Sequence, residues 1–309
     1  MREAIHSYFR LGTVFFVSYP GAAGSDEELL ERLRQFAADD AFEAIELTHI
    51  ENPAVRKEVI EIVKSACLDV SYAAQGCLLG QKKNLNALDE GERRSAVELM
   101  KSCIDEACEM GAESVSFLAG KYEPGKEADA MDALVASVCE LCDYMESKGK
   151  LRLAIEVFDY DLDKCSLIGP AYRVKELMER VCPLKKNFGA LVDLSHIPQI
   201  HESVKEAILP VRDYIIQAHM GNCVIKEGCS LRGDLHPRYG YPNSEVDLPM
   251  IKEYLETLLE IGFLSKEKRP ILSFEVKPFG TDDPKIIMAA SKRMLTKAWD
   301  LACPQEEYA

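Results

Sequence analysis

The chain has 309 residues, of which 47% are hydrophobic and 8% aromatic, and its formal net charge is −15. This length and composition suit a large globular protein with an aliphatic core, and the negative charge disfavours nucleic acid and anionic membrane surfaces as partners. The sequence shows no run of roughly 20 apolar residues, no cleavable signal and no disulfide-framework pattern among its eleven cysteines. We therefore expect a soluble, cytoplasmic protein.

Short apolar runs alternate with longer amphipathic segments along the whole chain, which predicts repeated strand–helix units. Helix N-caps are predicted in the segments SDEE and LDEGE, and helix ends at Gly111 and Gly262. Eight such units predict a closed (β/α)₈ TIM barrel as a single domain over residues 1–309, with a doubly wound open sheet as the alternative. The predicted strands are residues 13–20, 44–50, 68–76, 114–120, 151–159, 188–196, 215–222 and 270–278.

One long connection breaks this alternation. Residues 220–247 are rich in glycine, proline and polar side chains and show no helix or strand pattern. Connections of this length are usually functional or mobile. In a barrel this segment follows the seventh strand, so we expect it to lie over the C-terminal mouth, where catalytic groups gather.

Four of the last predicted strands carry an acidic or imidazole residue near the C-terminal end: Glu156, Asp193, His219 and Glu275. A barrel brings these ends to one mouth, where three carboxylates repel one another unless a cation neutralises them. Oxygen-rich ligation with one imidazole suits Mn²⁺, Mg²⁺, Co²⁺ or Fe²⁺ better than a structural zinc site. The alternative is that each acid is hydrogen-bonded or paired separately, which is how we interpret Glu46 on the second strand.

The order Glu, Asp-x-x-His, His and Glu on strands five to eight resembles the xylose isomerase-like superfamily, which contains sugar isomerases and epimerases and also endonuclease IV. The resemblance covers nearly the whole chain. It implies that Glu156, Asp193, His219 and Glu275 are the ligands of one divalent ion, and that His196 faces the substrate or a second ion. We expect Mn²⁺, with Mg²⁺, Co²⁺ or Fe²⁺ as alternatives.

Such a site supports proton removal from carbon. A metal that binds a sugar carbonyl and the neighbouring hydroxyl withdraws electrons from the carbon between them, so that the proton on this carbon becomes removable. A positioned carboxylate or imidazole moves that proton. The resemblance implies that Glu156 and Glu275 act as acid and base, with His196 as a further catalytic candidate. Lys277, two residues after Glu275 on the same strand face, would bind an oxyanion, although a solvated rim charge is an equally good interpretation.

The long connection supplies further candidates for substrate binding. Its segment GDLH is similar to a Gly-Asp-x-His segment of the superfamily, which implies substrate contacts from Asp234 and His236. Ketose epimerases of this type carry an arginine six residues after the histidine ligand, where this chain has Ile225. Arg232 or Arg238 would have to replace that arginine.

The expected function is that of a metal-dependent isomerase or epimerase acting on a small carbohydrate or glycoside. The segments EVFDYDLDKCSLIGP, LVDLSHIP, HMGNCV and HPRYGYP are similar to bacterial sugar phosphate isomerase/epimerases and to the metal-binding α subunits of C-glycoside deglycosidases. A carbon–carbon lyase, or a subunit that needs a partner, is therefore an alternative. We expect a homo-oligomer, or a hetero-oligomer with a small second subunit.

An endonuclease IV-type nuclease is the remaining alternative. It needs histidines from strands three and four, where this chain has AAQG and FLAG. The charge of −15 also disfavours binding to DNA. A second metal ion on His196, Asp234 and His236, of the endonuclease kind, stays open.

Overall fold

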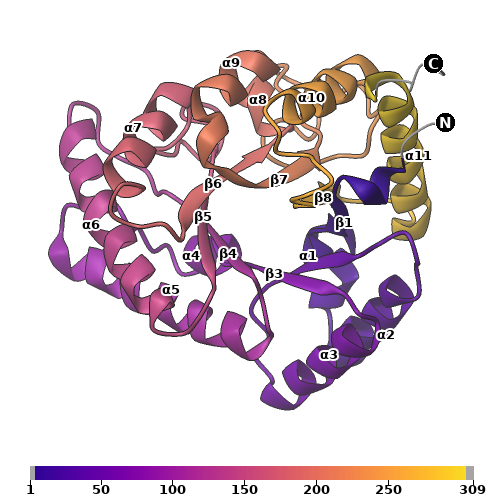
Figure 1. The fold of residues 1–309 in the computed structure, drawn as a ribbon, viewed down its shortest axis with the longest axis horizontal. Helices are drawn as coiled ribbons and strands as arrows, with labels where there is room; N and C mark the ends of the chain where they lie inside the picture. The colour runs from indigo at the N-terminus through magenta and orange to yellow at the C-terminus, as the bar shows by residue number, and fades with distance from the viewer. Residues whose placement is uncertain (1–3, 304–309) are drawn as a thin grey trace.

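The computed structural model describes residues 4–303, which form a (β/α)₈ barrel (Figure 1). The sheet order β1-β8-β7-β6-β5-β4-β3-β2 confirms the predicted architecture, and a bridge between Val14 and Glu46 joins its two edge strands. No helix within the described residues is long and apolar enough to cross a membrane. The strands are β1 Arg10–Thr13, β2 Ala44–Leu47, β3 Asp69–Ala73, β4 Ser114–Leu118, β5 Arg152–Glu156, β6 Phe188–Asp193, β7 Ile215–Gly221 and β8 Ile271–Glu275.

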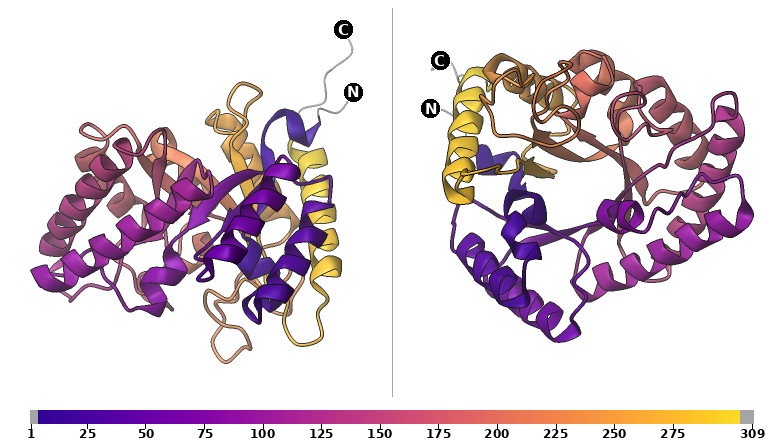
Figure 2. Two further views of the ribbon diagram at one scale, coloured as in Figure 1. Left: turned by 90° about the horizontal axis from the view of Figure 1, so that it is seen from below. Right: turned by 180° about the vertical axis from the view of Figure 1, so that it is seen from behind.

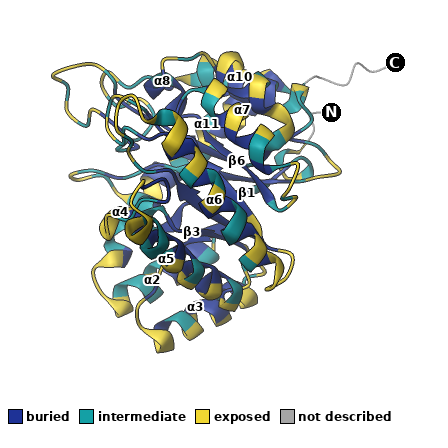
Figure 3. Ribbon diagram, turned by 90° about the vertical axis from the view of Figure 1, so that its left-hand side faces the viewer, coloured by how far each residue is buried: buried dark blue, intermediate teal, exposed yellow. Residues whose placement is uncertain are grey.

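Helices surround the strands and turn their buried faces inward (Figures 2 and 3). The predicted caps are confirmed, since Ser25 and Asp89 each accept a backbone N–H at a helix start, and Gly111 and Gly262 have φ of 73° and 66°. The helices are α1 Phe15–Ser18, α2 Asp26–Ala37, α3 Pro53–Ser65, α4 Gln75–Gly80, α5 Glu90–Glu109, α6 Glu127–Glu146, α7 Ala171–Val181, α8 His196–Gln199, α9 Val204–Ile208, α10 Leu248–Glu260 and α11 Pro284–Ala302, with 3-10 helices at Ile5–Ser7, Pro20–Ala23 and Leu209–Tyr214.

The predicted strand at residues 13–20 is wrong. The first strand lies at Arg10–Thr13, and the apolar run that follows it forms α1. Gly12 suits this narrow part of the barrel, because a Cβ atom there would lie 2.7 Å from Ser273 Oγ. Phe15 packs against Phe36 of α2, with ring centroids 5.9 Å apart. Tertiary packing thus outweighs the strand preference of these β-branched and aromatic residues.

The connection between β7 and α10, residues 222–247, returns to the barrel mouth. One bridge joins Val224 to Gly233 within the connection, and another joins Pro237 to Lys277, just after β8. The backbone N–H of Lys277 also donates to the carbonyl of His236 at 2.6 Å. These bonds bring the connection to the ends of β7 and β8, as its sequence position predicts.

Candidate metal centre

The four predicted ligands come from four consecutive strands of the barrel. Asp193 at the end of β6 pairs in register with His219 of β7, while Glu275 at the end of β8 pairs with Gly221. Glu156 ends β5. Each of the four side chains offers one ligand atom, and these atoms all lie within 4.8 Å of one another. The fold therefore brings the predicted residues into one buried cluster.

Two carboxylate oxygens of this cluster are buried without a hydrogen-bond partner among the described residues. They are Glu156 Oε1 and Asp193 Oδ2. The other oxygens are satisfied, because Gln75 Nε2 donates to Glu156 Oε2 at 2.6 Å and the N–H of Ser195 donates to Asp193 Oδ1 at 2.6 Å. Buried polar atoms normally have partners, and a divalent cation would supply one to both oxygens. The residues present therefore fit such an ion.

His219 is oriented as a ligating histidine would be. Its Nε2 lies 2.9 Å from Oε1 of Glu46, whose side chain is fully buried and also accepts a hydrogen bond from Gln217 at 2.8 Å. Its Nδ1 faces the acids, 2.8 Å from Glu275 Oε2 and 3.6 Å from Glu156 Oε1. Metal-binding histidines typically donate their second ring N–H to a carboxylate. Glu46, expected as a hydrogen-bonded core acid, is that carboxylate.

The electrostatics of the cluster reflect its excess of acids. Burial opposes protonation of His219, yet the surrounding glutamates, Glu46 foremost, hold its pKa well above the ordinary value. Burial raises the pKa of Glu275 against the effect of the neighbouring imidazoles. Burial would also raise the pKa of Asp193, but the imidazoles hold it below its usual value. Carboxylates this close together repel one another, so either protonation of the site or a bound cation at the barrel mouth would stabilise them.

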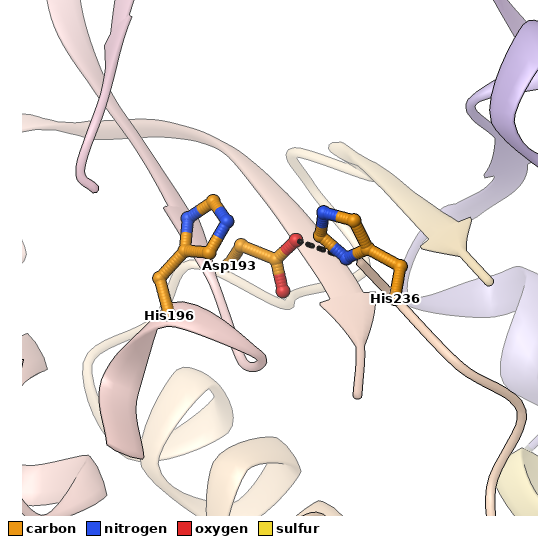
Figure 4. Close-up of side chains that lie close together, drawn as sticks. All are labelled: Asp193, His196 and His236. Atoms are coloured by element: carbon orange, nitrogen blue, oxygen red, sulfur yellow. Dashed lines mark ion pairs between the residues drawn. The ribbon is translucent and has the colours of Figure 1, made fainter. Parts of the chain in front are cut away.

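A second group of possible ligand atoms adjoins the first. Asp193 lies between the rings of His196 and His236 (Figure 4), and the ligand atoms of these three residues are within 4.8 Å of one another. The Nε2 atoms of both rings contact Oδ1 of Asp234, at 2.9 and 2.8 Å. His196 Nδ1 donates to the carbonyl of Val157 at 2.7 Å. Asp234 thus ties both imidazoles together.

Gly221 makes room for this second group. A Cβ atom at Gly221 would lie 2.7 Å from His236 Nδ1 and 2.9 Å from Ser195 Cβ. His236 itself has φ of 50°, a strained conformation for a residue with a side chain. The backbone is thus shaped to place the His236 ring against the end of β7.

A cavity of about 220 Å³ opens over the cluster. Arg238 and His196 are not among its lining residues: Arg238 Nε lies 3.7 Å from Asp282 Oδ1, and His196 Nε2 lies 2.9 Å from Oδ1 of Asp234, which does line the cavity. The predicted substrate-binding residues Asp234, His236 and Lys277 do line it. Its wall includes the predicted metal ligands Glu156, His219 and Glu275 and also three residues that our sequence analysis did not identify, Phe16, Gln75 and Lys164.

A larger cavity of about 570 Å³ lies beside the first, between α1, α2 and the segment that joins β2 to α3. Its wall is mostly apolar and contains none of the predicted site residues. Phe16 borders both cavities. We place the site in the smaller cavity, because that is where the convergent acids and imidazoles are.

The comparisons with known proteins agree with this fold. The family model described as xylose isomerase-like TIM barrel matches residues 34–290, whereas a search of curated proteins found no match. Similar solved structures include a D-tagatose 3-epimerase-like protein (17% identity, TM-score 0.72, 95% of this chain and 98% of that one) and an L-ribulose 3-epimerase (16%, 0.72, 97% and 100%). A 3-keto-D-glucoside 4-epimerase from E. coli is also similar (14%, 0.67, 93% and 99%). The chain belongs to the xylose isomerase-like TIM barrel family.

Proposed function

We propose that this chain is a divalent-metal-dependent carbohydrate enzyme of the sugar isomerase or epimerase type. The observation that carries the proposal is a pair of buried oxygens, Glu156 Oε1 and Asp193 Oδ2, that lack a hydrogen-bond partner among the described residues and belong to a cluster of four possible ligands. Family membership and the presence of sugar epimerases among the similar structures support the same chemistry. Glu156, Asp193, His219 and Glu275 would hold the ion, with Mn²⁺ as the first candidate metal.

The small cavity suits one sugar ring. At about 220 Å³, it falls below the roughly 300–1,000 Å³ of pockets that enclose drug-sized ligands. A bound divalent ion would polarise a sugar carbonyl and so acidify the neighbouring C–H group. Side chains of this protein would carry out the proton transfer and orient the sugar.

Glu156 and Glu275 are the proposed proton-transfer groups. They end β5 and β8 and reach the cavity from either side of His219. Removal of the proton by one carboxylate, and delivery of another proton to the opposite face by the second group in its protonated form, would invert that carbon. Gln75 fixes one oxygen of Glu156 by its hydrogen bond of 2.6 Å and so sets the orientation of this carboxylate at the cavity.

Polar groups around the cavity would orient the sugar. Lys277 lines the wall and would bind a sugar oxygen through its ammonium group, while Asp234 and His236 would bind hydroxyl groups. His196 lies behind this wall and would act through Asp234, which it contacts at 2.9 Å. Arg238 would reach the substrate only by leaving Asp282.

Proton exchange is the experiment that tests the proposal. The purified chain, loaded with Mn²⁺, is incubated in D₂O with D-fructose, D-tagatose and L-ribulose, and ¹H NMR follows deuterium incorporation beside the carbonyl. We expect incorporation that a chelator abolishes and that Glu156→Gln loses. Glu106→Gln is the matched control, because Glu106 is a buried glutamate bonded to a histidine outside the cluster. Metal-loaded protein that exchanges no proton on any of these sugars would contradict the proposal.

The apolar cavity of about 570 Å³ favours a second candidate, a carbon–carbon lyase acting on 3-keto-C-glycosides. The sugar would occupy the small cavity and the aglycone the large one, past Phe16. Proton removal beside the carbonyl by one carboxylate would then lead to cleavage of the carbon–carbon bond, with a proton delivered to the departing aglycone carbon by the second group in its protonated form. Release of free aglycone from a 3-keto-C-glycoside tests this candidate. Release only when a second polypeptide is added would identify the chain as one subunit of a hetero-oligomer.

A further inference from the structure

The second ligand group raises the question of how many ions the mouth holds. It consists of Asp193, His196 and His236, joined by Asp234, whose Oδ1 contacts both imidazole Nε2 atoms. Imidazole and carboxylate groups in this number are typical ligands of zinc and related metals. Judged by ligand types alone, two ions could bind side by side and share Asp193.

A lysine side chain already occupies the position beside this group. Lys164 Nζ lies 2.8 Å from Asp234 Oδ2 and 2.9 Å from Asp163 Oδ2. Both oxygens of Asp234 are therefore engaged, one with the imidazoles and one with the ammonium. Burial opposes the charge on Lys164, but the two aspartates overcome this effect and raise its pKa. The ammonium is thus a permanent cation at neutral pH.

The loop after β5 holds Lys164 in this place. Asp159 is buried, and its carboxylate accepts hydrogen bonds from the backbone N–H groups of residues 162–165 at distances between 2.7 and 3.2 Å. Asp163 Oδ2 also accepts the backbone N–H of Asp234 at 3.2 Å, which links this loop to the connection after β7. The backbone that carries Lys164 is therefore fixed next to the segment that carries Asp234.

We propose that the ammonium group of Lys164 takes the place of a second cation beside Asp234, so that the centre holds one metal ion. This inference rests on the proposed function. A divalent ion on His196, His236 and Asp234 would bind the same carboxylate that already pairs with the Lys164 ammonium. Two positive charges on one carboxylate lie close together and repel each other strongly in a buried site. Removal of the ammonium would free Asp234 Oδ2 to bind that ion beside the imidazoles.

The consequence for function is a restriction of chemistry. Two-metal centres clamp the attacking and leaving oxygens of a phosphoryl displacement. A single ion with a lysine beside it lacks that clamp and suits the polarisation of one carbonyl. By excluding a second ion, Lys164 thus prevents the two-metal nuclease chemistry that the second ligand group would otherwise support.

Metal content tests the inference. The full chain and its variants are equilibrated with excess Zn²⁺, and in parallel with Mn²⁺, passed through a desalting column and analysed by mass spectrometry of the metals. We expect one ion per wild-type chain and two per Lys164→Met chain. The double variant Lys164→Met/Asp234→Asn should return to one ion, because the second site then lacks the carboxylate of Asp234.

Lys277→Met is the matched control. Lys277 lines the same cavity but is not among the ion-pair partners of Asp234, so its loss should leave one ion. Lys164→Gln provides a second neutral variant for the case that Lys164→Met does not fold. One ion in wild type and in both Lys164 variants, or two ions in wild type, would overturn this inference alone. No ion in the wild-type chain would overturn the proposed function together with it.

Discussion

Glu46→Gln is the substitution that probes the support of the metal centre without touching a proposed ligand. Glu46 lies at the end of β2, fully buried, and accepts hydrogen bonds from His219 and Gln217. The substitution keeps the size of the side chain but removes its negative charge. We expect weaker metal binding, because the carboxylate both orients the His219 ring and makes its Nδ1 a stronger ligand.

The size of the effect follows from these contacts. A glutamine can still accept from His219 Nε2, but its NH₂ group then faces the NH₂ group of Gln217, which lies 2.8 Å from Glu46 Oε2. If Gln217 turned over, Ser114 Oγ, which now donates to its Oε1 at 3.0 Å, would have to accept a hydrogen bond instead. Loss of such supporting carboxylates costs roughly 10–100-fold in metal affinity. That range corresponds to about 1.4–2.7 kcal/mol of binding free energy.

Competition with a fluorescent chelator measures the affinity of each variant for Mn²⁺. Glu106→Gln is the control, since Glu106 is buried and bonded to His49 at 2.6 Å but lies outside the cluster. We expect wild-type affinity for this control. Glu46→Gln protein that binds Mn²⁺ as tightly as wild type, or an equal loss in Glu106→Gln, would refute the assigned role of Glu46.

Three further predictions concern the mouth of the barrel. Glu156→Gln and Glu275→Gln should each lower turnover at least 100-fold and weaken metal retention; kinetics and metal analysis measure both, and full activity in either would contradict the assignment. His196→Ala should lower turnover more than it lowers the unfolding temperature, and the reverse order would indicate a structural role. Burial lowers the pKa values of His196 and His236, but their acidic neighbours overcome it and raise them to about 10 and about 9. In protein stripped of metal, these imidazoles should stabilise the fold fully below pH 6.5 and lose that effect as pH rises through 9–10. The unfolding temperature should therefore fall between about pH 6.5 and pH 10. An unfolding temperature that stays constant or rises over this interval would contradict the prediction.

Seven of the eight strands could be predicted because their β-branched runs lie between clear helix signals. The strand at Arg10–Thr13 could not, since Arg10 and Gly12 have low strand preference and are fixed there by the neighbouring strands. Gly12 packs against Ser273, and the guanidinium of Arg10 pairs with Asp69 and Glu113 at the N-terminal ends of β3 and β4. Such contacts involve residues far apart in the sequence, and no local pattern reveals them.

The ligand cluster was predictable for a different reason. Acids and imidazoles at strand ends cost free energy in a core, so Glu156, Asp193, His219 and Glu275 stood out one by one, and the barrel topology alone implied that they meet. That they hold a metal ion stays a proposal. The fold adds what the sequence concealed, namely that Glu46 of a distant strand supports His219.

Lys164 could not be identified from the sequence. It stands in a polar segment, DYDLDK, that is indistinguishable from a solvated loop. Only the hydrogen bonds from the loop backbone to Asp159 bring its ammonium against Asp234. Gln75 was likewise hidden, because a glutamine after the third strand carries no charge to signal its bond to Glu156.

Anomalous scattering from crystals of the full chain grown with Mn²⁺ would test the central claim most directly. We predict one anomalous peak, contacted by carboxylate oxygens of Glu156, Asp193 and Glu275 and by Nδ1 of His219. A map without a peak among these four side chains, or with the manganese bound elsewhere, would contradict it.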